Sequence, residues 1–149
     1  MNMSKEAGVH LSGLEQLRAM KQQGKVAPIA RLMNFGIVEL EEGRAVFEGH
    51  PSEDVYNPIG TVHGGYAATL LDSACGIAVH TKLAAGQAYT TLELKVSYHK
   101  AITAETGVVR AEGKVISFGR RAAFAEARIT DTEGRLLASA TSSLLVITP

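Results

Sequence analysis

The sequence predicts an α+β fold in which one long, buried helix packs against an antiparallel sheet of five or six strands. Two observations carry this prediction. Residues 62–83 are apolar on almost every side, with few charges and no proline, which is typical of a helix enclosed by other elements. From residue 89 onward, strand-length runs alternate with short turns, which favours a meander of strands that pair with their neighbours in sequence.

The chain is expected to begin with a helical extension, residues 1–30, ahead of the main domain, residues 31–149. Apolar residues at helical spacing indicate a short amphipathic helix over residues 11–22, which Gly24 ends. A further helical turn fits residues 29–35. The extension itself carries no motif that points to a function.

The main domain is expected to open with two strands, 35–40 and 44–49, joined by a turn that ends at Gly43. A polar loop with two prolines leads into the long helix. After the helix, alternation places four residues on one face of a strand: Leu92, Leu94, Val96 and Tyr98. Three more strand-length runs follow, at residues 106–117, 120–131 and 135–147.

Composition and charge narrow the function class. The chain has 149 residues, enough for one domain with a real core, and its fifteen basic and fifteen acidic residues give a net charge of zero. This balance argues against a broad nucleic-acid surface. The single cysteine, Cys75, forms no internal disulfide. Neither a secretory signal nor an apolar run of the roughly 18 residues that cross a bilayer is present, so we expect a cytoplasmic protein without a membrane partner.

The segment NPIGTVHGGYAATLLD, residues 57–72, contains two features that are unfavourable for the stability of the helix. Gly64 and Gly65 stand at the start of the long helix, where glycine lowers helix stability, and Asp72 places an acid on an apolar helix. Glycines at a helix start leave backbone N–H groups open to a ligand, at the positive end of the helix dipole. These groups can stabilise a developing oxyanion; alternatively, the glycines allow tight packing of helix against sheet.

Asp72 lies seven positions after Gly65, so the two face the same side of the helix about 10 Å apart. One helix therefore does not bring the carboxylate to a carbonyl group held at the glycines. A second, antiparallel copy of the helix would, so the spacing predicts a two-fold dimer with two composite sites. The competing interpretation is an acid that bonds a neighbouring hydroxyl, Thr69 or Ser73.

The string Asn57-x-x-Gly60-x-x-His63-Gly64-Gly65, followed by Leu70-Leu71-Asp72, resembles the acyl-CoA thioesterases of the phenylacetate-pathway (PaaI-like) group. Two later runs also resemble strands of this family: Thr91–Tyr98, and Ala123–Ala127 after Gly119-Arg120-Arg121. The resemblance covers about residues 34–147. It implies the hotdog fold, in which a curved antiparallel sheet wraps a long central helix.

The resemblance implies an acyl-CoA thioesterase in which coenzyme A is part of the substrate, with no separate cofactor and no metal. Asp72 would act as general base or as nucleophile, and the Gly64 amide as oxyanion donor. Asn57 would donate its amide to the thioester or to water, or serve the turn before Pro58. His63 would orient Asn57 and its loop, or cap the helix. The family also implies a homodimer and, where two dimers pair, a homotetramer.

Further contacts follow from the same resemblance. Thr91 aligns with a position whose hydroxyl orients the attacking water; Thr90 is the alternative, because only one of two adjacent strand residues faces the site. Arg120 and Arg121 would hold the phosphates of coenzyme A, or form a solvated strand end. The expected substrate-binding residues are Gly65, Tyr98, Ser117, Gly119, Arg120 and Arg121. Pocket width is expected to depend on Tyr66, Thr69, Leu70, Ile77 and the N-terminal segment.

The acyl group is expected to be aromatic, of the phenylacetyl or hydroxybenzoyl type, or a medium chain. Two other functions stay open. A non-catalytic acyl-CoA sensor is disfavoured by Asp72 and by the lack of a helix-turn-helix in the extension. A hotdog hydroxyacyl-thioester dehydratase has a histidine–acid motif that this chain does not match. The sequence has no G-x-S-x-G motif, zinc-ligand spacing or Walker-type loop, and Cys75 is interpreted as a core residue rather than a nucleophile.

Overall fold

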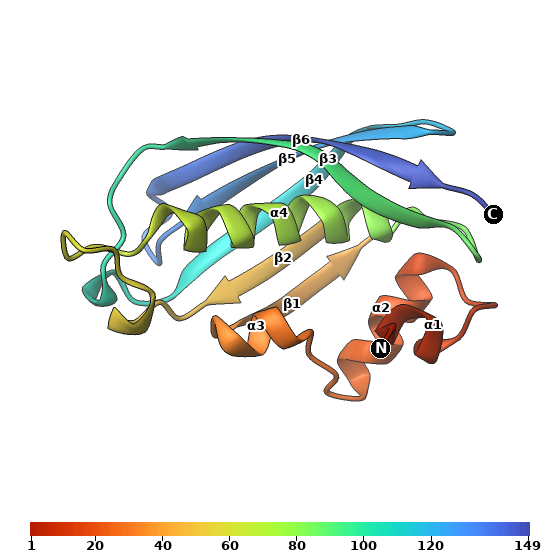
Figure 1. Cartoon of the computed structure of the whole chain (residues 1–149), viewed down its shortest axis with the longest axis horizontal. Coiled ribbons are helices and arrows are strands. Elements are labelled where there is room, and N and C mark those ends of the chain that lie inside the picture. The colour runs from red at the N-terminus through yellow and green to blue at the C-terminus, as the bar shows by residue number, and fades with distance from the viewer.

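The computed structural model describes residues 1–149 and confirms the hotdog fold: one curved antiparallel sheet of six strands wraps the long helix α4 (Gly64–His80) (Figure 1). The sheet order is β1-β2-β4-β5-β6-β3. Two short 3-10 helices, η1 (Glu53–Val55) and η2 (Ala104–Thr106), lie in connections. The strands are β1 (Phe35–Glu41), β2 (Arg44–Gly49), β3 (Ala88–Tyr98), β4 (Val109–Phe118), β5 (Ala122–Thr130) and β6 (Leu136–Ile147).

The meander expected after the helix is wrong for β3. Strands β4, β5 and β6 pair in sequence order, but β3 pairs with β6 and forms an edge of the sheet instead of lying beside β4. The connection over residues 99–108 includes η2 and is longer than the two to five residues typical of a hairpin loop. It runs past the start of α4 and delivers β4 to the open side of β2 (Figure 1).

A β-bulge in β3 changes which residues face the helix. The register with β6 shifts between Thr91 and Glu93, so Leu92 is the extra residue, and 63% of its surface is exposed. Leu94 and Val96 pack against the core as expected, whereas the inward position expected for Leu92 is wrong. Because of the shift, Thr91 lies on the same side of the strand as Leu94.

Helix α4 is shorter at both ends than the expected interval of residues 62–83, because His63 caps its start and Thr81 caps its end. It lies across the concave face of the sheet (Figure 1). Gly113 of β4 makes this close approach possible, since a Cβ at that position would overlap the backbone of Ala74 in α4. No helix in the chain has the length and apolar character needed to cross a membrane.

The N-terminal residues form three helices, α1 (Met3–Ala7), α2 (Gly13–Gln22) and α3 (Pro28–Leu32). Helix α2 begins two residues later than expected because Ser12 and Glu15 form a capping box. The start of α2 lies against the end of α4, where the Gly13 amide donates a 2.9 Å hydrogen bond to the Leu83 carbonyl. This contact joins the extension to the C-terminal end of the central helix (Figure 1).

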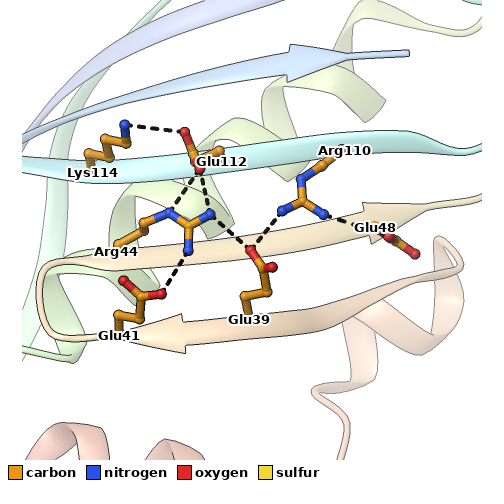
Figure 2. A network of polar contacts seen from close by, with 7 residues as sticks. All are labelled: Glu39, Glu41, Arg44, Glu48, Arg110, Glu112 and Lys114. Carbon is orange, nitrogen blue, oxygen red and sulfur yellow. Dashed lines mark hydrogen bonds and ion pairs between the residues drawn. The ribbon is translucent and has the colours of Figure 1, made fainter. Parts of the chain in front are cut away.

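The outer face of the sheet carries an ion-pair network across β1, β2 and β4 (Figure 2). Arg44 lies 2.8 Å from Glu39 and 2.7 Å from Glu112, and Arg110 lies 2.7 Å from the same oxygen of Glu39. Side chains alternate along β4, so these charges lie opposite Gly113 and the helix. The shared carboxylate ties the edge strand β1 to the rest of the sheet.

Candidate active site

Asp72 and Thr91 meet where α4 packs on β3. Thr91 Oγ1 donates a 2.9 Å hydrogen bond to Asp72 Oδ1, and both residues are half-buried. Thr90 is exposed, so of the two threonines only Thr91 reaches the carboxylate. Thr69, one of the two alternative partners, instead donates to the Gly65 carbonyl at 2.8 Å. No group of the chain bonds Asp72 Oδ2, so one oxygen of the carboxylate is held and the other is open.

These two residues line a cavity of about 400 Å³, which we call the first chamber. Ile77 and the N-terminal segment line it, as expected, whereas Tyr66, Thr69 and Leu70 do not. Tyr66 and Leu70 point into the core instead. The apolar walls come from the main domain and the extension together: Phe35, Ile37, Phe47, Ile77 and Tyr89 from the first, and Leu17, Met20, Val26 and Ile29 from the second.

The sequence motifs do not identify Tyr89 or the individual residues of the extension that line the first chamber. A signal for the extension exists in the sequence, because Val26 and Ile29 are apolar residues in a segment otherwise rich in Gly, Lys and Pro. Both remain partly exposed, at 43% and 50%, beside the chamber. No comparable signal marks Tyr89, because the bulge that sets the inward face of β3 has no signature in the sequence.

The start of α4 presents one open amide. The Gly65 amide donates to Nδ1 of His63 at 2.8 Å, so His63 acts as the helix cap. The Gly64 amide has no acceptor within the chain. The Tyr98 hydroxyl donates to the Gly64 carbonyl at 2.7 Å, which places the end of β3 over the helix start. Gly64 and Tyr98 line a separate cavity of about 380 Å³.

Asn57 is engaged in the turn before the helix. Its Oδ1 accepts the amides of Ile59 and Thr61, both at 3.1 Å, and its Nδ2 donates to Thr61 Oγ1 at 2.8 Å. This is the turn chemistry that was the alternative for this residue. One hydrogen of the Nδ2 amide group remains uncommitted, and His63 makes no hydrogen bond to Asn57.

The remaining expected contacts lie at the β4–β5 turn. Gly119 donates its amide to the Ala122 carbonyl at 2.8 Å and closes the turn. Arg120 and Arg121 are exposed and form no ion pair, and Ser117 is exposed on β4. The strand pairing aligns the start of β5 with the Thr90–Thr91 level of β3, at the opposite end of the sheet from Tyr98. One chain therefore does not bring these arginines to the start of α4.

Two other titratable groups near Asp72 stay neutral. Burial, with a smaller effect of the Asp72 charge, raises the pKa of Tyr89 to about 12. Burial, with added effects of Asp72 and Glu126, raises the pKa of the Cys75 thiol to about 12. Cys75 is fully buried, so it is a core residue as expected and not a thiolate nucleophile.

The site residues therefore form two groups within one chain. Asp72 and Thr91 face the first chamber, while Gly64 and Tyr98 line the other cavity at the helix start. Gly64 and Asp72 are separated by about 12 Å along the helix axis, at about 1.5 Å per residue. A carbonyl group held at the Gly64 amide is thus beyond reach of the carboxylate on the same helix.

A family model of the thioesterase superfamily matches residues 59–138, a region that contains α4, Asp72 and Thr91. The chain is 29% identical over 101 residues to the 1,4-dihydroxy-2-naphthoyl-CoA hydrolase of Listeria monocytogenes, which covers 68% of this chain and 80% of that protein.

Two solved structures extend the comparison. A mutant of the phenylacetic acid degradation protein PaaI from Thermus thermophilus has a TM-score of 0.72 at 28% identity, over 80% of this chain and 98% of that one. A Streptococcus mutans protein bound to acetyl CoA has a TM-score of 0.70 at 25% identity, over 77% of this chain and 90% of that one. Both likenesses extend over most of the main domain.

Proposed function

The chain belongs to the thioesterase superfamily of thioester hydrolases, and we propose that it hydrolyses an acyl-CoA to a free acid and coenzyme A. The Listeria relative is named as a hydrolase of a CoA thioester, and the Streptococcus structure holds acetyl CoA. Both support coenzyme A as the thiol part of the substrate. The acyl part is an aryl group or a medium chain.

The observation that carries the proposal is the Thr91–Asp72 hydrogen bond in the wall of a largely apolar chamber. A carboxylate is costly to place beside so much apolar surface, so its presence there favours a functional role. Thr91 holds Oδ1, so the carboxylate cannot turn freely, and Oδ2 has no hydrogen-bond partner and is free to take part in the reaction. The chamber offers the acyl group a place next to this oxygen.

Two routes fit this geometry. As general base, Asp72 Oδ2 takes a proton from water while the water oxygen attacks the thioester carbonyl carbon. As nucleophile, Oδ2 attacks that carbon itself, and water hydrolyses the resulting mixed anhydride. In both routes the carbonyl oxygen becomes an oxyanion, the C–S bond breaks, and the thiolate of coenzyme A leaves and takes up a proton. The open Gly64 amide at a helix start suits the oxyanion.

We propose that the two groups of site residues are joined in a homodimer with composite sites. Asp72 and Thr91 of one protomer would face the Gly64 amide of its partner, with a further pairing of dimers into a tetramer. The separation of about 12 Å along one helix supports this arrangement. So does the position of β3 at the edge of the sheet, where its outer backbone groups are open to a second strand.

Coenzyme A would then run from the helix start toward the β4–β5 turn of the assembly. Tyr98 borders the cavity at the helix start, and Gly65 follows Gly64 there as the second residue of α4. Arg120 and Arg121 are free cations suited to the pyrophosphate and ribose phosphate. Gly119 lies in the same turn, and Ser117 lies just before it on β4. Replacing both arginines by alanine is expected to raise KM with little change in kcat.

The test is release of coenzyme A thiol from phenylacetyl, hydroxybenzoyl, dihydroxynaphthoyl and hexanoyl thioesters. Asp72→Asn is expected to lower kcat by about 100- to 10,000-fold, the usual contribution of such a group. Asp54→Asn is the matched control, because Asp54 is an exposed acid on η1 outside both cavities. Size-exclusion chromatography establishes that the oligomer is unchanged in both variants.

The outcomes separate the competing functions. Wild-type turnover that Asp72→Asn abolishes and Asp54→Asn retains supports the proposal. Tight binding of the thioesters without turnover by the wild type would replace it with an acyl-CoA sensor. Addition of water to an enoyl thioester, without thiol release, would replace it with a dehydratase.

A further inference from the structure

The first chamber adjoins a second cavity. This second chamber, of about 530 Å³, lies between α1, α2 and the C-terminal end of α4. Five residues line both chambers: Leu17, Met20, Ala27, Ile77 and Tyr89. The chambers therefore share one apolar wall. Met20 is part of it, and its flexible thioether side chain adapts readily to a ligand.

We propose that the two chambers form one acyl channel and that the substrate carries an extended, apolar acyl chain of roughly ten carbons. The inference rests on the proposed thioesterase function and names its substrate class. It makes the N-terminal extension the element that sets the length of the acyl chain, because residues of both α1 and α2 line the second chamber.

The length follows from the helix that runs beside both chambers. Asp72 marks the reacting end, Ile77 the shared wall, and His80 the far part of the second chamber. At about 1.5 Å per residue, the shared wall lies about 7.5 Å and His80 about 12 Å from Asp72 along the axis. An extended chain advances about 1.25 Å per carbon, given a C–C bond of about 1.5 Å. About six carbons thus reach the shared wall, and about ten reach His80.

The chemistry of the second chamber suits a hydrocarbon. Val9, Pro28 and Leu83 contribute apolar walls. Its most deeply buried polar groups satisfy each other, because His80 Nε2 lies 3.1 Å from Gln16 Oε1 and Gln16 Nε2 donates to the Gly8 carbonyl at 3.0 Å. The cations that line the chambers, Lys5, Lys21 and Lys25, are all exposed residues.

A single-ring acyl group does not make use of this arrangement. Such a group ends at the shared wall and leaves the second chamber unfilled. An extended chain fills both chambers, and each added methylene that becomes buried is expected to raise kcat/KM by roughly three- to four-fold.

The experiment measures kcat/KM for saturated acyl-CoAs from hexanoyl to dodecanoyl, below the concentration at which they form micelles. For the wild type, the decanoyl-to-hexanoyl ratio is expected to be about 100. Val9→Trp fills only the second chamber, at a residue that is 61% exposed and tolerant of change, and is expected to lower this ratio at least ten-fold. Met20→Trp narrows the channel at the shared wall and is also expected to lower the decanoyl-to-hexanoyl ratio.

Gln22→Trp is the matched control, because Gln22 is an exposed residue of α2 outside both chambers, and the ratio is expected to stay unchanged. A flat wild-type profile beyond hexanoyl, or a ratio that neither tryptophan variant lowers, would overturn the channel. A non-hydrolysable thioether series, bound to Asp72→Asn, separates this inference from the proposed function. Affinity that rises with chain length, together with no turnover of any thioester by the wild type, would retain the channel and reject the thioesterase.

Discussion

At the scale of single residues, Thr91 is expected to act on the proposed reaction through Asp72. Its hydroxyl lies 2.9 Å from Oδ1, and the β-bulge at Leu92 is what turns it toward the helix. A carboxylate held by one hydrogen bond keeps the orientation of its second oxygen. Thr91 is therefore a positioning residue, and its loss should change kcat more than KM.

We expect Thr91→Val to lower kcat by about 10- to 100-fold, the value of a hydrogen bond to a charged group, with little change in KM. Thr91→Ser, which restores the hydroxyl, should recover most of the activity. Thr90→Val is the control on the exposed side of the same strand. Steady-state kinetics with one thioester distinguish the three variants. An equal loss of kcat in Thr90→Val would contradict the assigned orientation of β3.

The hydroxyl of Tyr66 is a second feature at this scale. Tyr66 is 1% exposed, and its oxygen has no hydrogen-bond partner. Burial raises the pKa of its phenol to about 12, so the group stays neutral. An unpaired buried hydroxyl has lost its bonds to water without replacement, which lowers stability.

Tyr66→Phe is therefore expected to raise the free energy of unfolding by about 1–2 kcal/mol. Tyr56→Phe is the matched control, because the Tyr56 hydroxyl accepts the Ala104 amide at 2.8 Å. That control should lower the free energy of unfolding by about 1 kcal/mol. Urea denaturation measures both. Destabilisation by Tyr66→Phe comparable to that of the control would mean that the buried hydroxyl has a partner after all.

At the scale of elements, the contact of α2 with α4 depends on His80. This residue is 7% exposed, faces Gln16 at 3.1 Å, and stacks edge-on against Tyr89 with ring centroids 5.7 Å apart. Burial lowers the pKa of His80 from 6.5 to about 4. The folded chain thus keeps the imidazole neutral at a pH at which the unfolded chain protonates it.

Stability should consequently fall as pH drops from about 6.5 to about 4, by about 3 kcal/mol from this group alone. Above pH 6.5 His80 causes no loss of stability, because its imidazole is then neutral in both the folded and the unfolded chain. His80→Phe keeps a ring against Tyr89 and should lose this part of the slope, while carboxylates titrate alike in both proteins. Urea unfolding at pH 7 and pH 4.5 measures the difference. Parallel pH profiles would contradict the assigned pKa.

The elements also show what the sequence can and cannot predict. The apolar stretch behind Gly64 predicts α4 because a helix without a polar face must be enclosed. The same kind of pattern fails for β3, since strand pairing depends on a ten-residue connection whose path is set by tertiary packing. Asp72 and Gly64 stand out as local costs, whereas the walls of the chambers come from ordinary apolar residues such as Met20 and Ile77, which only the fold brings together.

At the scale of the whole molecule, the chain carries each half of the proposed site once, at two places. The acid lies at the middle of α4 and the open amide lies at its start, in separate cavities. The proposed two-fold dimer with antiparallel helices would join the acid of each protomer to the amide of the other. This arrangement makes a prediction about mixed dimers that a site within one chain does not share.

Two inactive variants should therefore restore activity when combined. Asp72→Asn removes the acid, and Gly64→Val covers the open amide, where even a Cβ would lie 2.9 Å from the Tyr98 hydroxyl. In a mixed dimer, one composite site carries both defects and the other carries neither. Random mixing of equal amounts is expected to give about a quarter of wild-type turnover, because half of the dimers are mixed and each has one intact site.

Co-expression with two different affinity tags isolates the mixed dimer, for which about half of wild-type turnover is expected. Each variant mixed with itself is the control and should stay inactive, with an unchanged dimer on size-exclusion chromatography. If each site used Asp72 and Gly64 of the same chain, every site in the mixed dimer would carry one defect. Activity would then remain absent, and the composite arrangement would have to be abandoned while the assignment of Asp72 still stood.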